Sequence, residues 1–274
     1  MNITIKSLTL VSFAGLISIA AYGTPATNDI PAAPNDSTGE TSFNNSFYAY
    51  GDFYREKQNS SSFGDMNLYG GTVGYIHNFQ NQNYIQAEFT YLHGSDTWDQ
   101  SLYSSLDYTV VLSVDNHRDE YHLETMCGFG EKRIISFGLE YIYLYTYGKE
   151  VEKVTFTLNE NSYYSEYSGS SSDNLALAKV RIGYPFEIFS KQGQKLAITP
   201  SITGGIGCAF RTGDYDYFHW AYESDAKCSV SYSFGRSEII AEGGYRTFGS
   251  FARIGSSASW IDGIFARAGY AFKW

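Results

Sequence analysis

The sequence contains little charge, little cysteine and no long apolar run beyond its first residues. Only 18% of the 274 residues are charged, and 19 Lys and Arg against 29 Asp and Glu give a net charge of −10. Nucleic-acid binding needs a basic surface, so nucleic acid is disfavoured as a partner. Three Cys are too few for a disulfide framework. A mean hydropathy of −0.28 argues against membrane-spanning helices.

Aromatic residues and glycine are abundant instead. The chain has 25 Tyr, 19 Phe and 27 Gly. This aromatic content excludes a disordered chain, and an ordinary cytosolic enzyme carries more charge.

The first 45 residues carry targeting signals rather than a domain. Residues 1–23 have one charge, Lys6, a short apolar run and a small-residue cleavage site at Ala21-Tyr22-Gly23, which predicts a cleaved secretory signal peptide. Residues 24–45 are polar and rich in Pro, Asn, Ser and Thr, so we expect a flexible periplasmic leader. The domain of interest is therefore predicted to span 46–274.

From residue 46 onward the dominant period is two, which is typical of β-strands. In 196–211, apolar residues such as Ile198, Ile202 and Ile206 alternate with Ser, Thr and Gly. Ten runs are expected to form strands: 46–56, 67–77, 84–93, 120–129, 134–147, 175–187, 196–211, 226–234, 238–248 and 260–274.

The composition of the two faces distinguishes a membrane barrel from a soluble sandwich. The apolar face carries Tyr, Phe and Trp near its ends, and the polar face carries Gly, Ser, Thr and charges of both signs. In lipid an open sheet edge cannot be satisfied, so the sheet must close. We predict an all-β fold, a closed antiparallel transmembrane β-barrel of about ten strands, with eight or twelve as alternatives, in the outer membrane of a Gram-negative bacterium.

The connections are expected to alternate between short periplasmic turns and long external loops. The predicted short turns are 78–83, 130–133, 187–194 and 235–237, and the predicted long loops are 94–119, 148–174 and 211–225.

The C-terminus carries aromatic residues at two-residue steps. Tyr270, Phe272 and Trp274 end the last predicted strand. They resemble the C-terminal signature of outer-membrane barrels that the barrel assembly machinery reads. The expected partners are therefore this machinery and outer-membrane lipid, with small solutes or lipopolysaccharide as further candidates.

Charged residues on the polar face are nearly balanced in sign and are expected to face the lumen. They could form a salt-bridge network that fills the barrel, or they could line a pore. These residues are Asp52, Glu88, Glu124, Glu140, Lys179, Arg181, Glu238, Glu242, Arg246, Arg267 and Lys273. No metal-ligand spacing is present, and we expect no metal and no cofactor.

Two acidic loops suggest a catalytic alternative. The predicted loop after the third strand contains Asp96 and Asp99, and the loop after the seventh contains Asp216 and His219. In strand count and in the position of these acids the chain resembles the omptins, ten-stranded outer-membrane aspartyl proteases. The resemblance implies that His219 is a base oriented by Asp216, with the acid pair polarising a water. However, both pairs are three residues apart, which places side chains on opposite faces of an extended strand, whereas omptin pairs are two apart.

The leading functional hypothesis is a small porin-like channel or a structural membrane protein, more probable than an enzyme. An omptin-like endopeptidase is the alternative. A surface adhesin is the second, because Tyr163, Tyr164 and Tyr167 could form an adhesive surface or simply extend strands above the membrane. The tyrosine-rich barrel is also similar to porin-like outer membrane proteins of environmental chlamydiae.

The cysteines allow one cross-link. Cys208 and Cys228 lie on the same face of neighbouring predicted strands, so a disulfide is possible and two free thiols are the default.

Overall fold

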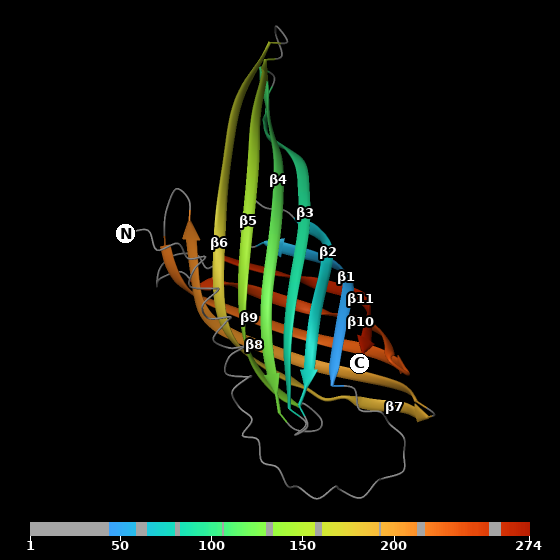
Figure 1. Cartoon of the computed structure of the whole chain (residues 1–274). Coiled ribbons are helices and arrows are strands. Elements are labelled where there is room, and N and C mark those ends of the chain that lie inside the picture. The colour runs from blue at the N-terminus through green and yellow to red at the C-terminus, as the bar shows by residue number, and fades with distance from the viewer. Residues whose placement is uncertain are drawn as a thin grey trace, which may run out of the picture. The chain divides into compact units, whose positions relative to one another are not determined.

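The described part of the chain forms eleven antiparallel strands (Figure 1). The computed structural model describes residues 44–58, 65–79, 83–105, 107–129, 134–156, 161–191, 193–212, 217–251 and 259–274. The strands are β1 (Asn45–Gln58), β2 (Asp65–Asn78), β3 (Tyr84–Ser104), β4 (Tyr108–Gly128), β5 (Ile135–Phe156), β6 (Ser162–Gly183), β7 (Phe186–Lys191), β8 (Gln194–Thr212), β9 (Tyr217–Phe234), β10 (Ser237–Phe251) and β11 (Ser259–Lys273). The predicted segments 1–23 and 24–45 lie outside the described residues except at their very end.

Ten of these strands close into a barrel. β1 pairs with β2 on one side and with β11 on the other, and β6 pairs with β8. Every strand of the ring therefore has two neighbours, as a sheet without free edges in lipid requires. The short β7 pairs only with the first residues of β8 and lies outside the ring. The predicted closed ten-stranded barrel is confirmed. The predicted turn at 187–194 is wrong in detail, because most of it forms this extra hairpin.

The predicted long loops are wrong, because most of their residues are strand. β3 continues to Ser104 and β4 begins at Tyr108, so these two strands take up most of 94–119, and β5 and β6 likewise continue through most of 148–174. Loop 211–225 shrinks to the segment between β8 and β9. A strand needs only about 9–11 residues to cross a bilayer. Since β3 to β6 are 21 or 22 residues long, about half of each extends beyond the membrane.

The extensions of these four strands form a four-stranded continuation of the barrel sheet that we call the blade (residues 95–104, 108–117, 147–156 and 162–171). Pairing between β2 and β3 ends at Leu68↔Gly94, and pairing between β6 and β8 begins at Ser172↔Thr212. Beyond these points β3 and β6 have neighbours only within the blade. Figure 1 shows the four strands rising past the ends of the rest of the ring.

Both chain ends of the barrel lie at the opposite end from the blade. The amide of Asn45 donates to the carbonyl of Trp274 at 3.1 Å. The tight turn between β9 and β10 lies at this end too. Gly235, at φ 59°, occupies a left-handed conformation that L side chains rarely adopt, which allows the turn between β9 and β10.

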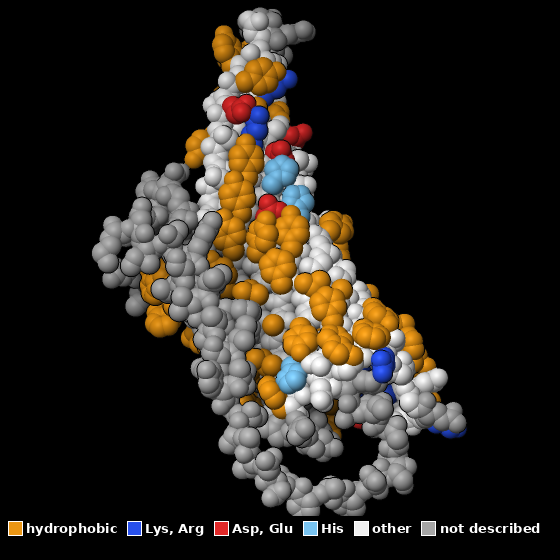
Figure 2. Space-filling view, in the orientation of Figure 1, with side chains coloured by type: hydrophobic (Ala, Val, Ile, Leu, Met, Phe, Trp, Pro, Cys, Tyr) orange, Lys and Arg blue, Asp and Glu red, His pale blue; other side chains and the backbone are white. Residues whose placement is uncertain are grey.

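The outer wall is apolar over the part of the barrel below the blade (Figure 2). Aliphatic side chains exposed on it include Val73, Leu139, Val180, Ile202, Ile206, Val230, Ile239 and Ile264. Aromatic rings border this belt on both sides. Tyr121 contacts Tyr91 and Tyr143 with centroids 5.0 and 5.9 Å away on the blade side, and Trp274 contacts Tyr75 and Phe272 at the other end. An aliphatic band between two aromatic girdles is the outer surface of a barrel embedded in lipid.

No helix among the described residues is long and apolar enough to cross a membrane.

Candidate functional site: the filled barrel interior

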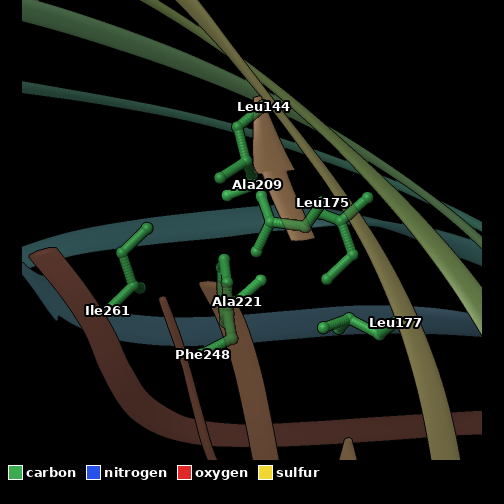
Figure 3. Close-up of a cluster of buried hydrophobic side chains, with 8 residues drawn as sticks. Leu144, Leu175, Leu177, Ala209, Ala221, Phe248 and Ile261 are labelled. Atoms are coloured by element: carbon green, nitrogen blue, oxygen red, sulfur yellow. The ribbon is translucent and has the colours of Figure 1, made fainter. Parts of the chain in front are cut away.

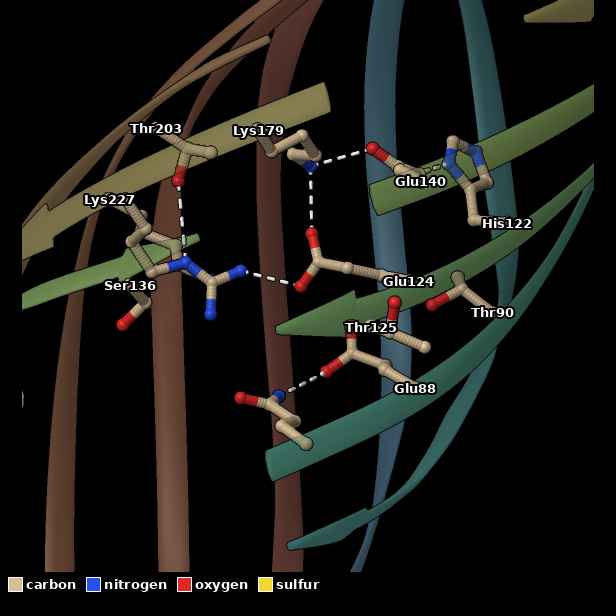
Figure 4. Close-up of polar contacts among 12 residues, drawn as sticks. Glu88, Thr90, His122, Glu124, Thr125, Ser136, Glu140, Lys179, Thr203 and Lys227 are labelled. Carbon is tan, nitrogen blue, oxygen red and sulfur yellow. Dashed lines mark hydrogen bonds and ion pairs between the residues drawn. The ribbon is translucent and has the colours of Figure 1, made fainter. Parts of the chain in front are cut away.

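Lys179 lies at the centre of a buried ion network inside the barrel (Figure 4). It is only 3% exposed, and its Nζ lies 2.7 Å from Glu124 Oε2, 2.6 Å from Glu140 Oε2 and 2.9 Å from Glu223 Oε2. Arg181 Nη2 binds the second oxygen of Glu124 at 2.7 Å. Successive side chains of a strand point to opposite faces of the sheet, and each of these residues occupies an inward-facing position of its strand. Four strands, β4, β5, β6 and β9, thus meet at one ammonium group.

A second cluster lies nearer the blade and joins opposite walls. Arg246 on β10 donates to Glu56 on β1 at 2.5 Å and to Glu120 on β4 at 3.0 Å, and Arg118 forms ion pairs with both carboxylates. The Arg246 guanidinium also lies over the ring of Tyr54, 4.5 Å from its centroid, a cation–π contact. Arginine suits this position because its planar fork binds two carboxylates at once.

His122 connects the two clusters. Its Nδ1 lies 3.0 Å from Glu140 Oε1 and its Nε2 lies 3.1 Å from Glu120 Oε2. The network is therefore continuous from Arg246 to Lys179 through one imidazole.

A third group lies closer to the chain ends. Arg267 binds Glu88 at 3.0 Å and Glu242 at 2.6 Å, and Lys227 also binds Glu242, at 3.2 Å. Asp52 accepts a hydrogen bond from Thr72 at 2.5 Å. Lys273 pairs with Glu238 at 2.7 Å below this group.

Apolar side chains fill the interior on the blade side of the charges. Figure 3 shows side chains of β5, β6, β8, β9, β10 and β11 pointing toward one another across the barrel. This cluster consists of Ile142, Leu144, Leu175, Leu177, Ala209, Ala221, Phe248 and Ile261. The sequence pattern predicted a polar lumen along the whole barrel, so this apolar layer was not expected. The alternation places each of these residues on the inward face. Some of them fell in segments predicted as loops, and the others lie on a face whose remaining residues are mostly polar.

Little space remains between the charged side chains. The cavity that Lys179, Arg181, Arg246 and Arg267 line among the described residues has a volume of about 40 Å³. A cavity of this size holds only a few water molecules, not a continuous column of water across the barrel.

The structure places every predicted lumen charge on the interior side of the wall. Asp52 is hydrogen-bonded to Thr72, and the other ten lie within the ion pairs given above. Further interior charges that the sequence pattern did not predict include Glu56, Arg118, Glu120, Glu223, Asp225 and Lys227. Arg118 and Glu223 were assigned to loops. Extending the alternation of 120–129 backwards by two residues would have found Arg118.

The predicted catalytic residues do not form an omptin-like arrangement within the described chain. Asp96 and Asp99 lie three residues apart on β3, which places them on opposite faces, with Asp96 facing inward opposite Asn116 and Asp99 facing outward opposite Ser113. His219 lies on β9 opposite Ala209, and Asp216 lies outside the described residues. The acid pair is thus not brought together.

The possible disulfide is wrong. Cys208 lies opposite Trp220 and Cys228 lies opposite Pro200, eight positions away along the β8–β9 ladder, and both thiols are free. Eight residues span roughly 26 Å along a strand, whereas a disulfide needs Cα atoms within about 7 Å. Sharing a face was correctly inferred, but the register of the hairpin was not.

A closed ring, a lipid-facing belt and an interior filled by ion pairs define a transmembrane β-barrel. No family model and no curated protein matches the chain. Among solved structures, the β domain of the Bordetella autotransporter BrkA matches with a TM-score of 0.44 and 9% identity over 84% of this chain and 100% of that chain. The translocator domain of the autotransporter NalP from Neisseria meningitidis gives 0.41 and 9% over 86% and 90%. The outer membrane protease OmpT from Escherichia coli gives 0.36 and 8% over 85% and 94%.

Proposed function

We propose that the chain is an outer-membrane protein of a Gram-negative bacterium whose barrel is a closed structural scaffold, without an open channel. The observation that carries this proposal is the interior cavity of about 40 Å³ among interlocked ion pairs. A pore conducts through a continuous water column, which wide barrels leave open and which small ones fill with side chains. Between the small-channel and structural alternatives, the packing favours the structural one.

The proposed cellular setting follows from the wall and the chain ends. Residues 1–23 would direct export and 24–45 would remain on the periplasmic side as a leader. Tyr270, Phe272 and Trp274 would be recognised by the barrel assembly machinery, and the belt would contact outer-membrane lipid. In this orientation the blade projects from the cell surface.

Planar bilayer recording tests the proposal. Purified protein is inserted into a lipid bilayer, and insertion is verified separately by flotation with lipid vesicles. We expect no unitary conductance from the wild type at neutral pH. The double variant Arg246→Ala with Phe248→Ala removes two stacked side chains that cross the interior, and we expect it to show intermittent conductance.

Lys149→Ala is the matched control, because Lys149 is an exposed blade residue far from the interior charges. It should remain silent, as the wild type does. Steady unitary conductance from wild-type protein with the same insertion efficiency would show that the barrel is a channel and would refute the closed scaffold.

A further inference from the structure

One face of the blade carries a continuous row of aromatic rings. The ring centroids of Tyr103 and Tyr108 are 5.1 Å apart, those of Tyr108 and Phe156 are 6.0 Å apart, and those of Phe156 and Tyr163 are 5.8 Å apart. The row crosses all four strands near the tip. It lies on the face that continues the barrel interior, which we call the inner face. Tyr103 reaches this face because a β-bulge between Ser101 and Tyr103 shifts the register, so that Tyr103 lies opposite Val110. These rings are far from the lipid belt, so membrane burial does not account for them.

The row is open to solvent rather than packed beneath other described residues. Tyr103 is 52% exposed and Tyr163 is 65% exposed, and Tyr167, on the same face of β6, is 66% exposed. Contiguous exposed aromatics on a soluble surface mark interaction sites, since leaving them in water is unfavourable.

Two carboxylates accompany the rings on the inner face. Glu150 and Glu152 share a face of β5 with Phe156, and Glu150 lies opposite Tyr167 in the β5–β6 ladder. Among the described residues neither carboxylate has an ion-pair or hydrogen-bond partner.

The cations of the blade lie on its other face. Lys149 and Lys153 flank the two glutamates in the sequence and lie on the opposite, outer face of β5. There Lys149 pairs with Glu166 at 3.0 Å, and Lys153 lies over the Tyr164 ring at 5.7 Å. The blade residues of the other three strands contain no Lys or Arg. The outer face thus carries cations beside its carboxylates, whereas the inner face keeps a net negative charge beside exposed rings.

We propose that the inner face of the blade binds a basic polypeptide segment of a partner protein. Lysine and arginine side chains match both features, because a cation is attracted to the face of an aromatic ring and to an unpaired carboxylate. Charge complementarity selects this partner over an acidic peptide or an anionic lipid, which Glu150 and Glu152 would repel. This inference does not depend on whether the barrel conducts.

The test uses the full chain in detergent micelles and a fluorescein-labelled hexa-arginine peptide, with binding followed by fluorescence anisotropy. We expect saturable binding that weakens as salt is raised, because salt screens exposed charges. The variant Glu150→Gln with Glu152→Gln should weaken binding about fivefold, as expected for losing exposed charge contacts. Tyr163→Ala should weaken it by about two- to fivefold, the range of one exposed cation–π contact.

Matched controls separate this site from general attraction to an acidic protein. Asp99→Asn with Asp115→Asn removes the same charge from the outer face, and Tyr164→Ala removes a neighbouring ring of that face. Each should leave the dissociation constant within about twofold of the wild-type value.

Two results would overturn the proposal. In the first, the outer-face aspartate variant weakens binding as much as the inner-face glutamate variant, which would mean that only net charge matters. In the second, a neutral oligosaccharide such as maltohexaose displaces the peptide from the wild type, which would identify the aromatic row as a glycan site.

Discussion

Removing the Lys179 ammonium while keeping its aliphatic bulk tests whether the interior network holds the barrel together. In Lys179→Met, three buried carboxylates lose their shared cation. Glu124 keeps Arg181 and Glu140 keeps His122, but Glu223 has no other ion pair within the described part of the chain. Truncating one partner of a buried pair costs about 3–5 kcal/mol, because the remaining charge is left without compensation. We expect the free energy of unfolding to fall by about this amount.

The measurement is reversible urea unfolding in phospholipid vesicles, followed by tryptophan fluorescence. A second variant identifies the cause of the loss. Adding Glu223→Gln to Lys179→Met removes the carboxylate that has no other cation, and it should restore about 1–3 kcal/mol, the cost of leaving such a group unsatisfied.

The matched control is Lys149→Met, which removes an exposed lysine that also pairs with a glutamate, at 3.0 Å. Exposed ion pairs contribute little to stability, so this variant should lower the free energy of unfolding far less than Lys179→Met does. If Lys179→Met costs no more than Lys149→Met, the interior charges are solvated and the network does not stabilise the barrel. The same result would weaken the case for a closed interior.

Two further predictions follow from local geometry. A Cβ at Gly74 would lie 2.1 Å from the Tyr48 ring, whose hydroxyl donates to Glu88 at 2.8 Å. Gly74→Ala should therefore displace the ring and lower the thermal midpoint of unfolding. Gly51→Ala is the control and should leave the midpoint unchanged, because a Cβ there meets no atom within 4 Å. The hydrogen bond and charge of its Glu166 partner raise the pKa of the Lys149 amine above its ordinary value, so the ion pair is present below that pKa and is lost as pH rises through it. Replacing this glutamate by glutamine should lower the pKa measured by NMR titration of the lysine side chain, and an unchanged pKa would mean that the pair does not form in solution.

The sequence predicts the barrel well where lipid acts on the wall. Between the two girdles, every strand must turn apolar groups to lipid and polar groups inward, so period two is enforced and readable. Ile202 and Ile206 on β8 and Val230 on β9 all face outward as the alternation predicts. The two-residue step of Phe272 and Trp274 likewise places both rings in the lower girdle.

The same reasoning fails in the blade, because the blade has water on both faces. There the alternation is no longer enforced. On β4, Val110, Val111 and Leu112 follow one another, and on β6 Tyr163 and Tyr164 are adjacent and both exposed. Period two disappears although the strands continue, so polar and mixed segments were interpreted as loops. Backbone hydrogen bonds extend the strands into the blade, and these bonds impose no alternation on the side chains.

The ion pairs of the interior depend on more than the faces of the strands. Glu56 and Arg246 lie 190 residues apart in sequence and on strands β1 and β10, which are not neighbours in the ring. The alternation predicts that both side chains point inward. The stagger of the strands in the closed ring then determines which inward charges lie close enough to pair. A shift of two positions in one hairpin would preserve every inward face and change the partners of each charge. The Cys208 and Cys228 prediction failed for this reason, since the face was correct and the register was not. The interior network is therefore a property of the register, and the Lys179 variants measure how strongly its ion pairs hold that register in place.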